Sequence, residues 1–365
     1  MLINNFMKVI FAGGGTGGHI FPAIAVADEL KKFDESSDIL FIGAKGRIEE
    51  KIVPANNYKL RTISVAGFSR KNLLKNISIL FKSYRALQSC YKILKEFKPD
   101  VVVGTGGFVS GPVVYSALKK KIPTLIQEGN SYPGMVTKYL SSKVNKVVIS
   151  FDDTLKYLKR KDNVVKISYP VRFSLIKSDK TEAKKFYGLG EGKTIFIFGG
   201  SQGAKGINEA IKKIFRDLYN DKINIIWQTG SREFESIKNL TNNFSDRVKV
   251  FEFIEKMQIA YSAADLVICR AGISSIMELA YLSIPVILVP YPQAAEDHQV
   301  KNALSLEKKD ACILIREEEQ NEKLFNTIIK VINDNKILEK LSENIFKFSD
   351  RDSAGKIARE IIQLT

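Results

Sequence analysis

Short apolar runs separated by helical patterns follow one another along almost the whole chain. The runs are continuously apolar rather than alternating, which is typical of parallel strands covered by helices on both faces. The first half predicts strands at residues 8–12, 39–43, 60–64, 101–104, 124–127, 146–149 and 164–167. The second half predicts strands at residues 193–198, 223–228, 248–251, 266–269, 286–289 and 312–315. Helices fit between the strands, so we expect a doubly wound α/β protein.

The pattern begins again after Tyr169–Arg172, with a strand, a glycine-rich loop and a helix. A chain of 365 residues is also too long for one ordinary core. We therefore predict two Rossmann-like domains, residues 1–172 and 173–349, that face one another across a cleft. The amphipathic pattern of residues 353–364 predicts a helix, and we expect segment 350–365 to pack back on the first domain. The N-terminus leads into the first strand without a secretory signal, and no run approaches the roughly 20 apolar residues of a membrane span.

Three glycine-rich segments, 13–18, 104–111 and 199–206, each follow a predicted strand. Glycines let the backbone approach a ligand closely, and a helix N-terminus behind such a loop favours an anion. The first two segments belong to one predicted sheet and are suited to hold a pyrophosphate together. Glycines that merely close tight turns explain one such loop, whereas three loops in two domains favour ligand binding.

The first glycine loop matches the dinucleotide fingerprint at Gly13, Gly15 and Gly18. That fingerprint also requires an acidic residue at the end of the second strand, where this chain has Ala44 and Lys45. No Gly-Lys-Ser/Thr sequence follows the first loop or the loop at 199–206. These departures disfavour an NAD enzyme and exclude a Walker-type nucleotide site.

The second half contains the elements of a nucleoside-diphosphate pocket. Residues Gly272–Ser275 follow a strand and predict a helix N-terminus that faces phosphates. Glu278 lies one turn further on the same face, where a carboxylate can accept two hydrogen bonds from a ribose diol. The alternative for Glu278 is an exposed helix residue. Segment 290–299 places further polar groups at the end of the next strand, where α/β proteins bind ligands.

The net charge of +16 indicates either an acidic partner or a composition biased toward Lys, Asn and Ile. Three widely spaced cysteines form neither a disulfide framework nor a zinc site, which favours a reducing compartment. We expect no metal and no cofactor, because Asp350 and Asp352, the one Asp-x-Asp pair, stand where a helix N-cap is expected. No sequence signature of a nucleic-acid-binding module is present.

Several motifs recur in a specific order and spacing. They are Gly14–His19 (GGTGGH), Gly104–Pro112 (GTGGFVSGP), Gln127–Asn130 (QEGN), Tyr169–Arg172 (YPVR), Gly199–Ala204 (GGSQGA), Cys269–Gly272 (CRAG) with Glu278, and Asp297–Gln299 (DHQ). In these motifs the chain resembles the MurG-type transferases, members of the GT-B glycosyltransferases, over essentially its full length.

The resemblance implies a reaction, its partners and a location. N-acetylglucosamine would pass from UDP-N-acetylglucosamine, with inversion, to undecaprenyl-pyrophosphoryl-N-acetylmuramyl pentapeptide. This step of peptidoglycan synthesis supports cell-wall growth, cell shape and division. The enzyme would lie peripherally on the cytoplasmic face of the inner membrane, on an anionic lipid surface, with no metal, cofactor or nucleic acid.

The resemblance also implies contacts for each substrate. Donor contacts would come from Thr16, Gly17, Gly18, Asn130, Arg172, Ser201, Gln202, Ile254, Ser274, Ser275, Glu278 and Gln299. We also expect Gly272, at a helix N-terminus, and Arg270 to stabilise the negative charge of the departing phosphate. The acceptor pyrophosphate would meet Gly14, Gly15, Thr105, Gly106 and Gly107.

Transfer to a hydroxyl requires a base, and His19 is the first candidate because a histidine pKa near neutrality suits proton transfer. The alternative is a histidine that caps the helix or holds a backbone carbonyl. Glu128 is the rival base.

A basic stripe and an apolar stripe share one predicted helix after residue 70. This pattern suits an anionic bilayer surface, and its alternative is a core-facing stripe with a solvated basic back. The membrane contacts we predict are Lys71, Leu74, Lys75, Ile79, Phe81, Lys82 and Arg85.

Three rival functions stay open. The nearest is a GT-B enzyme with another lipid acceptor, such as diacylglycerol. A UDP-N-acetylglucosamine 2-epimerase would share the fold without needing a membrane face. A nucleic-acid-binding protein would explain the positive charge alone.

Overall fold

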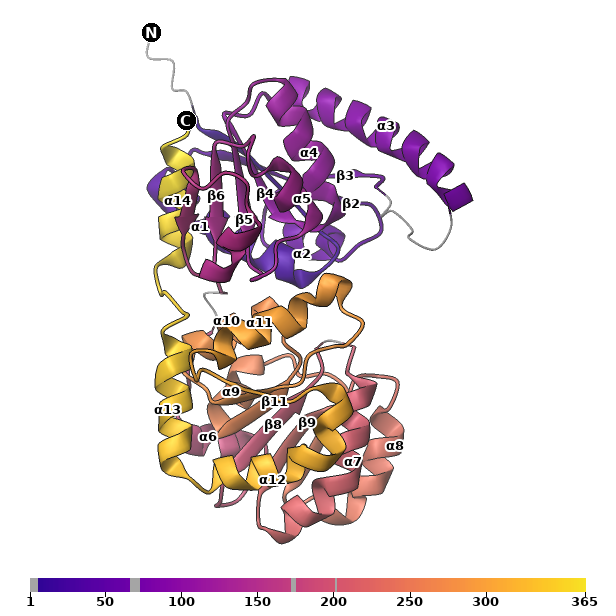
Figure 1. Cartoon of the computed structure of the whole chain (residues 1–365), viewed down its shortest axis with the longest axis vertical. Helices are drawn as coiled ribbons and strands as arrows, with labels where there is room; N and C mark the ends of the chain where they lie inside the picture. Colours follow the sequence, from indigo (N-terminus) through magenta and orange to yellow (C-terminus); the bar gives the residue numbers. More distant parts are fainter. Residues whose placement is uncertain (1–5, 66–72, 172–174, 201) are drawn as a thin grey trace. The chain divides into compact units, whose positions relative to one another are not determined.

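The computed structural model describes residues 6–65, 73–171, 175–200 and 202–365, with side chains in the helix at 73–97 from residue 84 onward. The chain divides into two compact units (Figure 1). The first unit contains residues 1–172 and 350–365, and the second contains residues 173–349. Each unit is built on one sheet.

The first unit contains a parallel sheet of seven strands in the order β3-β2-β1-β4-β5-β6-β7. Its strands are β1 Lys8–Gly13, β2 Asp38–Ala44, β3 Lys59–Ile63, β4 Val101–Gly106, β5 Thr124–Glu128, β6 Lys146–Ile149 and β7 Val164–Lys166. The central strands are buried at every position except Lys8 of β1 and Gly106 of β4, which explains their continuous apolar sequences.

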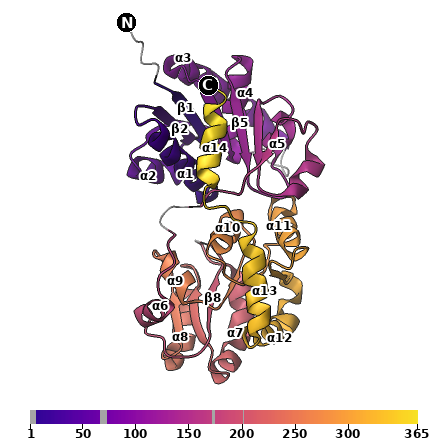
Figure 2. The ribbon, with the colours of Figure 1, turned by 90° about the vertical axis from the view of Figure 1, so that its left-hand side faces the viewer.

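Helices cover both faces of this sheet. They are α1 Gly17–Phe33, α2 Glu49–Ala55, α3 Leu73–Phe97, α4 Gly107–Lys119, α5 Met135–Leu140 and α14 Ser353–Ile362, with a 3-10 turn η1 Asp152–Tyr157. On one face α1 packs against α14, whose Ile357 and Ile361 enter the same core as Phe11 (Figure 2). On the other face Leu94 of α3 and Val113 of α4 join a second core.

The second unit contains a parallel sheet of six strands in the order β10-β9-β8-β11-β12-β13. Its strands are β8 Thr194–Phe198, β9 Asn224–Gln228, β10 Val248–Phe251, β11 Leu266–Cys269, β12 Val286–Leu288 and β13 Ile313–Leu314. Its helices are α6 Lys180–Phe186, α7 Lys205–Asn220, α8 Phe234–Thr241, α9 Met257–Ala263, α10 Ile273–Tyr281, α11 His298–Glu307, α12 Gln320–Ile332 and α13 Asn335–Phe346. Short 3-10 turns are η2 Asn242–Phe244, η3 Ala295–Asp297 and η4 Glu317–Glu319. The predicted α/β class with two parallel sheets is confirmed.

Strand order fixes where each unit can bind a ligand. In both sheets the first strand lies beside the fourth, because the chain runs outward in one direction and then returns to the centre. Such reversal points open a crevice at the carboxyl ends of the two central strands. The reversal points lie at β1/β4 and at β8/β11, and the carboxyl ends of these four strands, with the loops and helix starts that follow, carry most of the predicted donor and acceptor residues.

We predicted that an aspartate side chain caps the last helix, and this hydrogen bond is not made. Asp352 occupies the N-cap position of α14, but its side chain makes no capping hydrogen bond and instead pairs with Arg359. Asp350 pairs with Lys356 and accepts a hydrogen bond from the Asp352 N–H at 3.0 Å. The two carboxylates therefore stabilise α14 mainly through basic residues within it.

Among the described residues, no helix is long and apolar enough to cross a membrane.

Candidate functional site

The first crevice is shaped by an irregularity between β1 and β4. Ala12 pairs with Gly104, but Gly13 pairs with Gly106, so Thr105 is an extra residue on β4. A bulge of this kind turns a backbone group out of the ladder. The Thr105 carbonyl oxygen lies 3.0 Å from Nδ1 of His19. The bulge thus joins the β4 loop to the start of α1.

This contact determines the tautomer of His19. A carbonyl oxygen only accepts, so Nδ1 carries the proton, and in the neutral ring Nε2 holds the lone pair. The ring is partly exposed and packs on Gly106, where an added Cβ would lie 2.4 Å from Nδ1. The alternative in which His19 holds a backbone carbonyl is therefore observed, and it leaves the other nitrogen in the form that a base requires.

A buried carboxylate lies beneath the first glycine loop. Glu49 of α2 has 0% exposure and accepts hydrogen bonds from the Gly15 N–H at 3.1 Å and the Ala44 N–H at 2.8 Å. Gly15 is predicted to meet a pyrophosphate, but its N–H already donates to the Glu49 carboxylate. The role of Glu49 was not predicted, because the sequence does not distinguish it from the adjacent acid Glu50. Only the structure shows that Glu49 is buried and Glu50 exposed.

Glu128, the rival base, is fully engaged in its own loop. Its Oε1 accepts from the N–H of Asn130 at 3.0 Å and from the Asn130 amide at 3.2 Å. Its Oε2 accepts from the Gly134 N–H at 2.9 Å and from the Thr137 hydroxyl at 2.7 Å. These four hydrogen bonds hold the loop between β5 and α5 and occupy both carboxylate oxygens. Asn130, a predicted donor contact, is thereby tied to Glu128.

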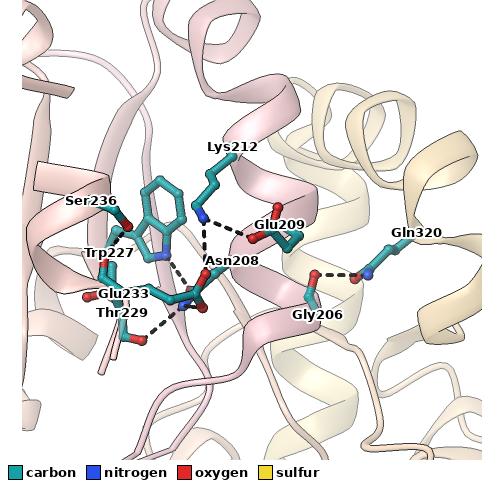
Figure 3. Close-up of polar contacts among 9 residues, drawn as sticks. All are labelled: Gly206, Asn208, Glu209, Lys212, Trp227, Thr229, Glu233, Ser236 and Gln320. Carbon is teal, nitrogen blue, oxygen red and sulfur yellow. Dashed lines mark hydrogen bonds and ion pairs between the residues drawn. The ribbon is translucent and has the colours of Figure 1, made fainter. Parts of the chain in front are cut away.

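In the second unit the glycine loop after β8 packs directly on the turn after β9. Gly203 has φ +75°, and an added Cβ would lie 1.9 Å from the Thr229 carbonyl oxygen. Asn208 of α7 donates to the same carbonyl at 2.9 Å and to Glu233 at 2.7 Å, and it accepts from the Trp227 indole at 3.0 Å (Figure 3). This buried amide fixes the loop that carries Gln202.

Arg270, at the end of β11, is buried rather than open to a ligand. It is 8% exposed, donates to the carbonyls of Val289 at 3.1 Å and Pro290 at 3.0 Å, and pairs with Glu317. These partners fix the end of β11 to the loop after β12 and to η4. The contact predicted between Arg270 and a phosphate stays a prediction.

Helix α10 presents the predicted phosphate and ribose groups. Gly272 occupies its N-cap position in an extended conformation without a side-chain cap, and Ser274 and Ser275 in the first turn are partly exposed. Glu278 is 8% exposed, so the alternative of an exposed helix residue is wrong. Its Oε2 accepts a hydrogen bond from the Tyr261 hydroxyl at 3.0 Å.

Burial and the negative charge of Glu278 raise the pKa of Cys269 on β11. Burial raises the pKa of the Cys269 thiol, and the charge of Glu278 raises it further, with a smaller opposing effect from Arg270.

Gln299, on α11, accepts a hydrogen bond from the Tyr291 N–H at 2.9 Å. Ile254 is 4% exposed and donates its N–H to the Gln228 side chain.

Several predicted site residues lie outside the described residues or belong to different units. Arg172, Ser201 and Lys71 lie outside the described residues, as do the side chains of Leu74, Lys75, Ile79, Phe81 and Lys82. Arg85 is exposed. Thr16, Gly17 and Gly18 belong to the first unit and Gln202 to the second, so their sharing of one donor stays a prediction.

Gln228, Asn208 and Tyr261 support the loops of the second unit and were not predicted from the sequence. Gln228 is a polar residue that ends an apolar strand, and Asn208 stands among buried apolar residues of α7. Both positions carry a detectable signal, because a polar side chain in an apolar setting needs a partner. Tyr261 gave no signal, since a buried tyrosine in a core is ordinary.

Comparisons with known proteins agree along the whole chain. The model of the glycosyltransferase family 28 N-terminal domain matches residues 9–149, and that of the glycosyltransferase family 28 C-terminal domain matches residues 194–357. A relative from Parabacteroides distasonis is 42% identical over 361 residues, which cover 98% of each chain. A relative from Ruminiclostridium cellulolyticum is 41% identical over 356 residues, 96% of this chain and 98% of its own. Both are named UDP-N-acetylglucosamine--N-acetylmuramyl-(pentapeptide) pyrophosphoryl-undecaprenol N-acetylglucosamine transferase.

Solved structures show the same architecture. The crystal structure of Acinetobacter baumannii MurG superposes with a TM-score of 0.78 at 25% identity, over 98% of this chain and 99% of that one. A UDP-N-acetylglucosamine 2-epimerase from Neisseria meningitidis has a TM-score of 0.67 at 16% identity, over 98% and 100% of the two chains, which shows a shared fold alone. With both domain models matched and full-length relatives above 40% identity, this chain belongs to glycosyltransferase family 28.

Proposed function

We propose that this chain transfers N-acetylglucosamine from UDP-N-acetylglucosamine to undecaprenyl-pyrophosphoryl-N-acetylmuramyl pentapeptide. The observation that carries the proposal is the 42% identity, over 98% of both chains, to a relative named for this reaction. The product would be the lipid-linked disaccharide of peptidoglycan synthesis. Inversion at the anomeric carbon fits a single displacement, with the acceptor hydroxyl attacking as UDP leaves.

His19 is the base in this proposal. Its Nδ1 is committed as a donor to the Thr105 carbonyl, so Nε2 is the nitrogen that takes the acceptor proton. Glu128 supports the loop at Asn130, because four hydrogen bonds already use both of its oxygens. A base at Glu128 would have to break some of them before it accepted a proton.

The departing UDP meets the second unit. The N-terminus of α10, from the Gly272 N-cap, offers backbone N–H groups and the positive end of the helix dipole. Glu278 binds the ribose hydroxyls, and the backbone beside Ile254 meets the uracil. Arg270 supports the β11 loop, which suits its burial and its ion pair with Glu317.

The acceptor pyrophosphate meets the two glycine loops of the first unit. Gly14 is packed beside Glu49 and Gly15 donates to it, so the negative charge of Glu49 disfavours a phosphate deep in the first loop. The first-turn N–H groups of α1 and α4 point to the better position, because both helices begin at these loops.

The lipid acceptor implies a peripheral position at the cytoplasmic face of the inner membrane. Three large side chains of the first unit are prominently exposed, with Tyr84 at 61%, Phe108 at 66% and Tyr139 at 74%. They come from α3, on which the basic stripe is predicted, from α4, which packs against α3, and from α5, which packs against α4. Aromatic side chains at such positions suit a headgroup region.

The test is transfer of labelled N-acetylglucosamine from its UDP donor to defined lipids. We expect product with the muramyl-pentapeptide lipid and none with diacylglycerol. Transfer to diacylglycerol without transfer to the muramyl lipid would overturn the proposed acceptor. Conversion of the donor sugar to its 2-epimer, without any glycolipid, would point to the 2-epimerase class.

A further inference from the structure

The carboxylate of Glu278 is held by a tyrosine from another helix. Tyr261 of α9 donates its hydroxyl proton to Oε2 of Glu278 at 3.0 Å. The direction follows from chemistry, because an ionised carboxylate only accepts. Both side chains are buried, with Tyr261 at 0% and Glu278 at 8% exposure. A carboxylate at this depth requires such donors to stay charged.

The tyrosine ring is itself fixed. It packs edge-on against Phe196, with ring centroids 5.7 Å apart, and against Phe198, with centroids 6.0 Å apart. Both phenylalanines belong to β8, the strand that leads into the glycine loop at 199–204. Helix α9 begins at Met257, three residues after Ile254. The hydroxyl therefore reaches Glu278 from an element that starts at the predicted uracil loop.

We infer that Tyr261 is a positioning residue for ribose recognition: its hydroxyl fixes the Glu278 carboxylate so that a nucleotide diol meets a preset acceptor. The inference rests on the proposed function, in which Glu278 binds the ribose of UDP. Holding Oε2 restricts rotation of the carboxyl group and so sets the position of its other oxygen. A diol that forms two hydrogen bonds to one carboxylate gains most from this restriction, because the ordering cost is met before binding.

The experiment compares UDP with 2′,3′-dideoxy-UDP, which lacks the diol. Dissociation constants are measured by calorimetry for the full chain, for Tyr261→Phe and for Tyr219→Phe. Phenylalanine keeps the ring packing of Tyr261 and removes only the hydroxyl. Tyr219 is the matched control, because its hydroxyl also donates to a carboxylate, that of Asp246 at 3.3 Å, at the other end of the sheet. Thermal unfolding verifies that each variant is folded.

We expect Tyr261→Phe to weaken UDP binding about tenfold, the scale of a hydrogen bond to a charged group, and to change dideoxy-UDP binding less than about twofold. Tyr219→Phe changes neither. Equal losses for both nucleotides, or no loss for UDP, would overturn the inference while leaving the ribose assignment in place. If the unsubstituted chain binds both nucleotides equally, the ribose role of Glu278 fails and the inference fails with it. The transfer assay reports on the proposed reaction separately.

Discussion

The side-chain oxygen of Gln228 accepts a hydrogen bond from the backbone N–H of Ile254 at 2.8 Å. The amide nitrogen of the same side chain donates to the Gly200 carbonyl at 3.0 Å. Gln228 is 2% exposed, and its bond to Ile254 is buried while its bond to Gly200 is partly buried. One amide thus joins the loop proposed to meet uracil to the loop proposed to meet the diphosphate.

Gln228→Met is expected to weaken UDP binding and to destabilise the second unit by about 1–3 kcal/mol, because it leaves a buried N–H and a buried carbonyl without this partner. Calorimetry with UDP and urea unfolding measure the two effects. Unchanged UDP affinity in a folded variant would show that the bridge is not needed for nucleotide binding.

Gln127→Met provides the contrast, because Gln127 lies near the end of β5 and is 4% exposed. Among the described residues, neither polar atom of its amide has a hydrogen-bond partner. We expect the substitution to leave the free energy of unfolding unchanged or to raise it by about 1 kcal/mol, since no bond is lost. A loss as large as that of Gln228→Met would mean that the Gln127 amide has a partner such as buried water.

His19→Ala is expected to lower kcat by about 10²–10⁴-fold, the usual contribution of a general base, while UDP binding changes little. His19→Asn is the companion variant, because the asparagine amide nitrogen matches the position of Nδ1 and can still donate to the Thr105 carbonyl, but it cannot take a proton at neutral pH. Comparable losses in both variants support proton transfer. Recovery of most activity in His19→Asn would instead assign the histidine to holding the β4 loop.

Glu49→Gln is expected to destabilise the first unit by about 1–3 kcal/mol, because the amide nitrogen that replaces one carboxylate oxygen cannot accept a hydrogen bond and would face a backbone N–H, either that of Gly15 or that of Ala44. Glu50→Gln is the control: Glu50 accepts from the Gly46 N–H at 3.0 Å but is exposed, and its change should stay within about 0.5 kcal/mol. Urea unfolding measures both. Equal effects would contradict the role given to burial.

Binding to vesicles that contain phosphatidylglycerol should exceed binding to phosphatidylcholine vesicles and weaken as salt rises. Arg85→Glu should lower the anionic-vesicle affinity several-fold, since each basic residue near the surface contributes about 1 kcal/mol. Lys330→Glu makes the same charge change on α12 of the second unit, which carries none of the predicted membrane contacts. Co-sedimentation measures all three chains, and equal losses in the two variants would remove the specific role of α3.

Much of the fold was predictable because buried parallel strands have continuous apolar sequences. The run at 101–104 and the run at 194–198, for example, carry a signal that depends on few neighbours. The bulge at Thr105 was not predictable, since it depends on how β4 pairs with β1. Glycine clusters marked the loops, but only the folded chain shows that Gly106 is required by the His19 ring.

Residues that act through one partner far away in sequence were the least predictable. Glu49 reaches Gly15, and Tyr261 reaches Glu278, through contacts that exist only after the helices have packed. The ion pair of Arg270 with Glu317 was likewise not predictable, because it depends on how η4 packs beside the end of β11. Sequence placed the loops correctly, whereas the partners of each side chain required the packed structure.

The position of α14 has a consequence for how the chain is made. Its Ile357 and Ile361 belong to the core of the first unit, yet they are synthesised after the whole of residues 173–349. The first unit can therefore be completed only after the second unit has been synthesised, and until then the face of α1 that α14 covers lacks this partner. A nascent chain stalled before residue 350 would offer that face to chaperones.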